Sequence, residues 1–162
     1  MDEVLKQLEL SGTERTEALE KCHAIVKAWG LKLPDVPGSP LHFGLRDFYR
    51  IGETEFDINN NVEQGYCGKF IFMFKGQTCP MHHHRLKHET FFLVKGRVEF
   101  RTPEETIVLE QGDRKIVDQR LKHEFTALED SLILESSKPD LVDDSIFDDP
   151  RTNQIIFGTA AP

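Results

Sequence analysis

Three things are scarce in this sequence, and each scarcity argues against a class of protein. The 162 residues include only three cysteines, Cys22, Cys67 and Cys79, whose scattered positions indicate no disulfide framework and favour a reducing cytoplasm. No apolar run approaches the roughly 20 residues of a membrane-spanning helix, and the acidic start, residues 1–4, lacks the layout of a signal peptide. Lys and Arg number 20 against 28 Asp and Glu, and the net charge of −8 argues against a nucleic-acid partner.

The length fits one domain with its own core, and the chain begins with helical patterns. Residues 2–10 predict a short helix. The pattern Ser11–Glu14 resembles a capping box that opens a longer helix, and Gly30 stands where that helix is expected to end. We therefore divide the chain into an N-terminal helical extension, residues 1–35, and a second domain, residues 36–162. The helices are expected to pack on the outside of a sheet or against a second subunit.

After the helical extension the pattern changes to that of short strands. Residues 43–51 and 66–75 predict strands, whereas residues 57–61, with Asp and three Asn, predict a turn or loop. Residues 155–157 predict a last short strand. Further strands are expected at 90–95, 97–101, 106–109, 115–118, 123–127 and 131–136. Several short strands broken by Gly and charged turns indicate an all-β sandwich or barrel.

A histidine-rich stretch in the middle of the chain predicts a metal site. His82 and His84 are two residues apart, so in an extended strand both imidazoles lie on one face and His83 points the other way. Glu89 opens the next apolar run, and His123 downstream is the best candidate for a fourth ligand. Imidazole and carboxylate ligands without thiolate suit Mn²⁺, Fe²⁺, Co²⁺, Ni²⁺ or Zn²⁺, and ligand type does not choose among them.

The spacing of these ligands resembles the first conserved motif of the cupin superfamily. That motif reads Gly, five residues, His-x-His, three or four residues, Glu, six residues, Gly. Gly76, His82, His84, Glu89 and Gly96 meet it in full. The resemblance implies an all-β fold, a cupin jelly-roll barrel, here with an N-terminal α-helical extension. The resemblance also implies that residues 36–162 form a cupin domain.

The second cupin motif is met in part. Gly112 and His123 have the separation that the motif requires. Asp118, Arg120 and Ala127 stand where the motif has Pro, Gly and Asn. These departures concern turn geometry rather than ligation, so the predicted metal site is unaffected.

Further stretches resemble a narrower group, the small cupin sugar isomerases of the D-lyxose isomerase family. They are residues 66–69, 76–80, 89–91, 135–137 and 146–151. The resemblance implies a metal-dependent aldose–ketose isomerase that acts on a free pentose or hexose, and it favours Mn²⁺ among the possible metals. It also implies a homodimer, with a small-molecule sugar as the partner of the site.

Four residues are candidates for roles in that chemistry. Glu135 ends an apolar stretch and either meets water at a strand end or faces the barrel interior; the resemblance favours the interior, where Glu135 would act as the general base. Lys69 is either a solvated strand lysine or an acid that assists on the sugar oxygens. Lys87 and Arg151 are assigned to substrate binding.

Two other classes of function fit the same ligands. A cupin dioxygenase would use them to hold iron, nickel or copper and to bind oxygen. A non-catalytic sugar- or metal-binding cupin would bind its ligand without turnover and would not need Glu135. Oxygen uptake distinguishes the first from an isomerase, and the absence of turnover distinguishes the second.

Overall fold

The computed structural model describes residues 2–162, which form eleven strands and three α-helices. The helices are α1 (Asp2–Leu8), α2 (Gly12–Ala28) and α3 (Pro150–Phe157), with a short 3-10 helix η1 (Val142–Asp144). The strands are β1 (Gly38–Leu41), β2 (Glu53–Asn61), β3 (Tyr66–Met73), β4 (Thr78–His84), β5 (Glu89–Lys95), β6 (Arg97–Arg101), β7 (Thr106–Glu110), β8 (Arg114–Val117), β9 (His123–Ala127), β10 (Ser131–Ser137) and β11 (Ser145–Phe147).

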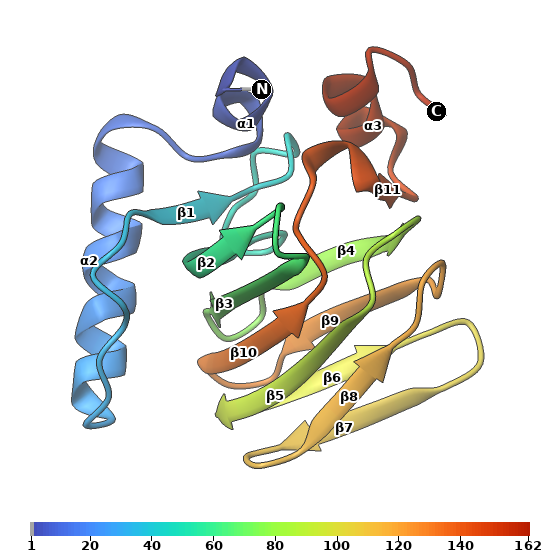
Figure 1. The fold of residues 1–162 in the computed structure, drawn as a ribbon. Coiled ribbons are helices and arrows are strands. Elements are labelled where there is room, and N and C mark those ends of the chain that lie inside the picture. The colour runs from blue at the N-terminus through green and yellow to red at the C-terminus, as the bar shows by residue number, and fades with distance from the viewer. Residues whose placement is uncertain (1) are drawn as a thin grey trace.

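The strands form two sheets that face each other as a jelly roll (Figure 1). One sheet has the order β1-β2-β3-β10-β5-β8 and the other the order β11-β4-β9-β6-β7. The paired strands within both sheets run antiparallel. The predicted all-β fold with a helical extension is therefore confirmed, and the strands expected between residues 66 and 136 are present.

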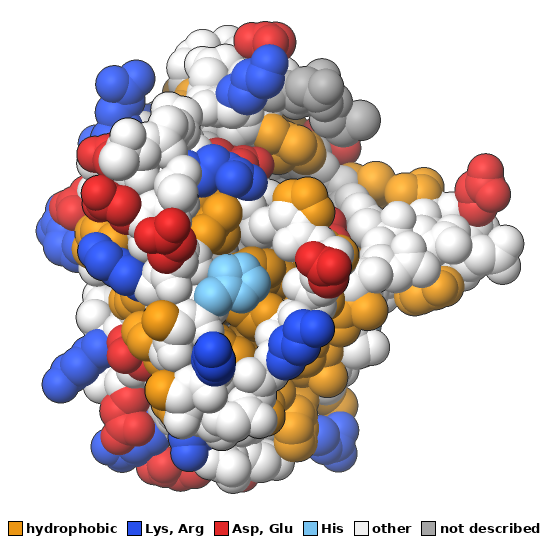
Figure 2. All heavy atoms as spheres, turned by 90° about the vertical axis from the view of Figure 1, so that its left-hand side faces the viewer, with side chains coloured by type: hydrophobic (Ala, Val, Ile, Leu, Met, Phe, Trp, Pro, Cys, Tyr) orange, Lys and Arg blue, Asp and Glu red, His pale blue; other side chains and the backbone are white. Residues whose placement is uncertain are grey.

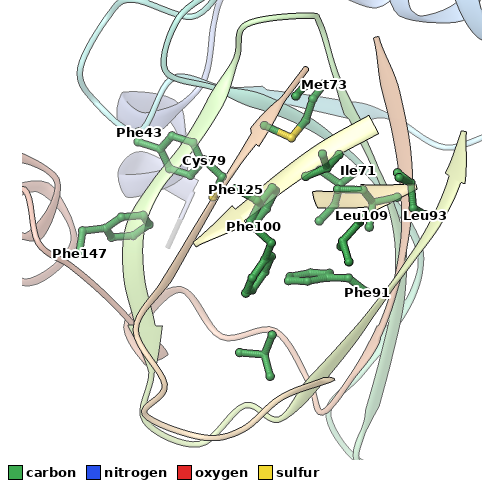
Figure 3. Packing of buried hydrophobic residues seen from close by; sticks show 14 residues of the cluster. Phe43, Ile71, Met73, Cys79, Phe91, Leu93, Phe100, Leu109, Phe125 and Phe147 are labelled. Atoms are coloured by element: carbon green, nitrogen blue, oxygen red, sulfur yellow. The ribbon is translucent and has the colours of Figure 1, made fainter. Parts of the chain in front are cut away.

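The main core lies between the two sheets, because alternate residues of each strand point inward. Phe91 comes from one sheet and Phe100 and Phe125 from the other, and the rings of Phe91 and Phe125 are 5.2 Å apart. Figure 3 shows these three rings together inside the barrel, with Phe43 and Phe147 to one side. Burying one such side chain stabilises the fold by roughly 1.5–3 kcal/mol.

A second, smaller core joins α2 to the outer face of the six-stranded sheet. Cys22 and Val26 of α2 pack with Phe56 of β2 and Phe72 of β3. This confirms the prediction that the helix packs on the outside of a sheet; Figure 2 views the molecule from this side. Within residues 2–162, no helix combines the length and the apolar character that crossing a bilayer requires.

Two predictions in the first half of the chain were wrong. Residues 43–51 form turns rather than a strand, because Phe43 and Arg46 adopt left-handed backbone angles, with φ of 53° and 57°. Residues 57–61 form the end of β2 rather than a loop. They pair with the start of β3, and these ladder hydrogen bonds override the turn preference of Asp and Asn. The short strand β1 was not predicted.

The predicted strand at residues 155–157 was also wrong, because these residues belong to α3. The Asp149 side chain caps the first turn by accepting a hydrogen bond from the backbone N–H of Arg151. Pro150 occupies the first turn of the helix, and Gly158 ends it with φ of 72°. A short apolar run by itself does not distinguish a strand from the end of a helix.

Candidate metal centre and the cavity beside it

Three strands bring the predicted ligands to one place. β4 directs His82 and His84 inward, and both side chains are buried, whereas His83 lies on the other face and is partly exposed. His123 opens β9 directly opposite His82, and Glu89 opens β5. Ligand atoms of the three inward histidines lie within 4.8 Å of one another, close enough to hold a metal ion.

The hydrogen bonds of the histidines leave one ring nitrogen free for a metal. Nδ1 of His82 lies 2.8 Å from the carbonyl oxygen of Pro80, and Nδ1 of His123 lies 2.9 Å from that of Leu121. Because a carbonyl oxygen only accepts, each Nδ1 carries a proton and the neutral ring presents the lone pair of Nε2. Burial, with the nearby His123 and His84 rings, holds the pKa of His82 well below its ordinary value.

The surroundings of Glu89 fit a bound cation. Its Oε1 lies 3.1 Å from Nε2 of His123 and 3.4 Å from Nε2 of His84. Among the described residues, neither Oε1 of Glu89 nor Nε2 of His123 has a hydrogen-bond partner, although both atoms are buried. A buried carboxylate oxygen beside an imidazole lone pair is unfavourable unless a positive charge lies between them. A divalent ion held by the three histidines next to this oxygen would meet that need.

Lys87 connects this ligand group to Glu135. Its Nζ lies 3.1 Å from Oε2 of Glu89 and 3.1 Å from Oε1 of Glu135, and all three side chains are buried. Burial alone would lower the pKa of Lys87, but the carboxylates of Asp140, Glu135 and Glu89 raise it well above its ordinary value. Burial would likewise raise the pKa of Glu89, yet the Lys87 ammonium holds it well below its usual range. Lys87 is therefore a fixed cation at neutral pH.

Lys69 forms a second buried ion-pair group on the neighbouring strands. Its Nζ donates to Oε1 of Glu55 at 2.7 Å and to Oδ2 of Asp140 at 2.6 Å. Burial opposes its charge, but Asp140, Glu55 and Glu135 raise the pKa of Lys69 well above its ordinary value. Asp140 also contacts Lys87 at 3.4 Å and thereby joins the two groups. Of the two alternatives for Lys69, the structure places it in the cavity wall rather than in solvent.

The loop that carries Lys87 is held by a buried carboxylate. Asp144, in η1, accepts backbone hydrogen bonds from Leu86 at 2.8 Å and from Lys87 at 2.9 Å. These bonds fix the short connection between β4 and β5, and so they fix the position of the Lys87 side chain between Glu89 and Glu135.

These groups line a cavity of about 220 Å³ inside the barrel. His82, His84 and Glu135 line it, whereas His123, which is fully buried, is not among the lining residues. Its acidic residues are Glu9, Glu53, Glu55, Asp57, Glu89, Glu135 and Asp140, and its lysines are Lys69 and Lys87. Leu5 and Leu8 of α1 and Ile156 of α3 contribute apolar wall. The cavity combines a candidate metal centre, an excess of carboxylates and an apolar side.

One stretch of this chain matches a known protein family. The model of the Cupin domain family matches residues 70–135, a stretch that includes all four predicted ligands. The chain contains a cupin domain. No curated protein matches the sequence.

Solved structures share the fold over much of this chain. L-ribose isomerase from Cellulomonas parahominis is similar with a TM-score of 0.69 and 16% identity, over 91% of this chain and 96% of that one. L-ribose isomerase from Acinetobacter sp. DL28, in complex with L-ribose, has a TM-score of 0.67 and 16% identity, over 82% and 83% of the two chains. KdgF from Halomonas sp. has a TM-score of 0.52 and 21% identity, over 56% and 83%.

The departures from the second cupin motif are accommodated by the backbone. Arg120 stands at the Gly position of the motif and adopts the left-handed conformation with φ of 65°. Its backbone N–H donates to the carbonyl oxygen of His84 at 2.7 Å, which ties this turn to β4. The turn therefore keeps its shape without glycine, and His123 still faces His82.

Arg151 is the predicted site residue that the structure does not bring to the cavity. Its side chain is exposed on α3, pairs with Asp149 and is not among the residues that line the cavity. Its assignment to substrate binding stays a prediction that this geometry does not support.

Four cavity or loop residues of this cupin were not singled out from the sequence. Glu53 and Glu55 lie on the inward face of β2, and their i, i+2 spacing with Asp57 is a signal that the predicted loop at residues 57–61 obscured. Asp140 and Asp144 lie in the polar stretch after β10, where no periodicity marks them.

Proposed function

We propose that this cupin is a metal-dependent aldose–ketose isomerase that acts on a free pentose or hexose such as D-lyxose. The observation that carries the proposal is the position of Lys87, whose Nζ lies 3.1 Å from both Glu89 and Glu135. This contact joins a candidate general base to a candidate metal ligand in one cavity. The likeness in fold to two L-ribose isomerases supports the same class of reaction.

The residues that would hold the metal are His82, His84, Glu89 and His123. The free Nε2 atoms and the unpartnered oxygen of Glu89 support this set. Mn²⁺ is the metal that we propose, with Zn²⁺, Fe²⁺, Co²⁺ and Ni²⁺ as the other ions that such ligands accept. A bound divalent ion supplies Lewis-acid polarisation of the sugar carbonyl group.

Glu135 is the residue that we propose to move the carbon-bound proton. Aldose-to-ketose conversion moves one hydrogen from C2 to C1 and one proton from O2 to O1. The Glu135 carboxylate would accept the proton from C2 and return it to C1. Ser137 Oγ and Lys87 Nζ both contact Oε1 of Glu135, at 2.7 and 3.1 Å, and so orient the carboxylate. Oε2 is then the oxygen that meets the substrate.

The two lysines would bind sugar oxygens as hydrogen-bond donors. Both are held protonated by the surrounding carboxylates, so neither is a base at neutral pH. Lys87 lies beside Glu135 and Lys69 beside Asp140, so each ammonium is fixed before a substrate arrives. Such preorganised donors favour oxygens on which negative charge develops during the reaction.

The composition of the cavity supports a neutral, multiply hydroxylated substrate. Its seven carboxyl side chains outnumber its two lysines, and none of the described lining residues is an arginine, so the cavity offers few cationic partners to a phosphorylated sugar or a sugar acid. D-lyxose and L-ribose have the same configuration at C2 and C3 and differ only at C4. The two sugars therefore present the same reacting carbons, and both are first substrates to test.

The first experiment incubates the Mn²⁺-loaded protein with D-lyxose and with L-ribose in deuterated water. We expect the 2-ketose to form, and deuterium at C2 of recovered aldose supports proton transfer through an enediolate. Ketose without solvent label indicates a hydride shift or a shielded proton. Glu135→Gln should keep the metal and lose on the order of 10²–10⁴-fold in rate, because it removes the base and preserves the shape. Glu129→Gln, an exposed change just before β10, is the control and should retain full activity.

Two results would contradict the proposal. Uptake of oxygen with a candidate substrate, without ketose formation, would support a cupin dioxygenase. Binding of sugar without conversion of any common aldose, in folded and metal-loaded protein, would support a non-catalytic binding cupin.

A further inference from the structure

The inward face of β2 presents carboxyl groups in a row. Glu53, Glu55 and Asp57 alternate along the strand, and all three line the cavity. Glu55 is matched by Lys69, whose Nζ lies 2.7 Å from its Oε1. Asp57 is paired with Lys69 in the strand register. Among the described residues, Glu53 has neither an ion pair with a lysine nor a lysine opposite it in the strand register.

Glu53 is buried without a partner for one of its oxygens. Its side chain is nearly inaccessible, with 4% of the residue exposed, and Oε2 has no hydrogen-bond partner among residues 2–162. Leu41 lies opposite it in β1, the Cys79 thiol is a hydrogen-bond partner of its side chain, and the charged groups that act on it are Glu55, Lys69 and Glu135. An apolar side chain would pack here without burying an unpaired oxygen. Stability therefore does not explain a glutamate at this position.

The carboxyl group of Glu53 is suited to hydrogen-bond a hydroxyl group. Burial and the Glu55 carboxylate raise the pKa of Glu53 well above its usual range, with Glu135 acting in the same direction and Lys69 against it. The carboxyl group accepts a hydrogen bond in either charge state, and it also donates one when it is protonated. A sugar hydroxyl, which also donates and accepts, is complementary to it.

We propose that Glu53 is a substrate-recognition residue that hydrogen-bonds a hydroxyl group of the sugar from the β2 wall of the cavity. This inference rests on the proposed function, since it concerns the same cavity and substrate class. β2 and β10, which carries Glu135, are separated by β3 in the sheet. Neighbouring strands are about 4.8 Å apart, so the backbones of β2 and β10 lie roughly 10 Å from each other. Glu53 therefore meets a part of the ligand that Glu135 does not.

The test measures binding of D-arabitol to the Mn²⁺-loaded protein by titration calorimetry. D-arabitol has the hydroxyl configuration of D-lyxose but no carbonyl group, so it cannot be isomerised. We expect Glu53→Gln, which can still donate and accept, to bind within about threefold of wild type. Glu53→Leu should bind about tenfold or more weakly, because it loses the hydrogen bond and keeps the volume. Glu104→Leu, in the exposed turn between β6 and β7, is the matched control and should bind like wild type.

Thermal denaturation of the same variants separates recognition from a structural role. We expect Glu53→Leu to unfold at or above the wild-type temperature, since it removes an unpaired buried oxygen. Wild-type affinity of Glu53→Leu for D-arabitol would overturn the inference and leave the isomerase proposal standing. Binding that depends on Glu53 in a protein that converts no aldose would support the inference and overturn the isomerase. A wild-type protein that neither binds D-arabitol nor converts an aldose would overturn both.

Discussion

His82 and His83 are adjacent in the chain but lie in different surroundings. The strand alternation of β4 directs His82 to the cavity, where its Nδ1 is bonded to the Pro80 carbonyl, and directs His83 to the other face of the sheet. The same alternation sends His84 back to the cavity. The two-residue period of a strand therefore places the candidate ligands His82 and His84 on one face and His83 on the other.

This separation predicts opposite effects of two adjacent alanine substitutions. His82→Ala should lose bound Mn²⁺, because it removes one of four ligands, whereas His83→Ala should retain it. Elemental analysis and Mn²⁺ titration of both purified variants measure the difference. Affinity of the wild-type protein should also fall as the pH is lowered from 7.5 to 5, since imidazoles must be neutral to bind a metal. Wild-type metal content in both His82→Ala and His123→Ala would rule out the four-ligand site.

At the scale of elements, the N-terminal helix closes one side of the cavity. Leu5 and Leu8 of α1 line it, and α1 lies against α3, as Figure 1 shows at the top of the barrel. The backbone N–H groups of His42 and Phe43 both donate to the carbonyl oxygen of Leu8, at 2.8 and 3.1 Å. The division into an extension of residues 1–35 and a domain of residues 36–162 stays a prediction, but α1 contributes wall to the cavity of that domain.

We expect Leu8→Ala to lower the free energy of unfolding by about 2–4 kcal/mol, because Leu8 is buried and its loss leaves a void beside the cavity. Gln7→Ala, the exposed neighbour on the same helix, should change it by less than about 0.5 kcal/mol. Denaturant unfolding of the two variants is the measurement. Equal stability of the two variants would show that α1 does not contribute to the folded cavity wall.

At the scale of the whole molecule, apolar surface remains on the hairpin of β2 and β3. Ile58, Val62 and Tyr66 are 50%, 59% and 47% exposed. Figure 2 shows an arm that projects from the body and carries hydrophobic side chains. The apolar stripe of α2 is used within the chain, since Trp29, just after the helix, packs against Phe72 at 6.0 Å. A second subunit is therefore expected at the hairpin rather than on that stripe.

We predict a homodimer that uses the β2–β3 hairpin. Light scattering at micromolar concentration should give twice the chain mass of 18.6 kDa. Val62→Lys should shift the protein toward the monomer, because it places a charge in an apolar contact. Val108→Lys, at an exposed position on β7, is the control and should leave the dimer intact. A monomeric mass for the wild-type protein would refute the prediction.

The helices α1 and α2, most strands and the metal ligands were predictable because each depends on local pattern. Helical and two-residue periods predict which face of a helix or strand is buried. The spacing of His82, His84 and Glu89 indicates candidate ligands on two consecutive strands. Residues 43–51 and 57–61 were misassigned because backbone angles and strand pairing outweigh residue preference there. Residues 155–157 were misassigned because a short apolar run does not distinguish a strand from the end of a helix. A short run cannot show which partner strand will pair with it.

The sequence by itself determined the all-β class, most of the strands and the identity of the candidate ligands, because these follow from residue type and spacing along the chain, whereas the jelly roll followed from the resemblance to cupins. Only the tertiary structure decided which charges meet in the cavity. Lys69, Glu55 and Asp140 come from three separate parts of the chain, and Asp140 lies 71 residues from Lys69. Burial shifts their pKa values and leaves Oε2 of Glu53 without a hydrogen-bond partner among the described residues. Burial is a property of packing among distant segments rather than of neighbours in sequence.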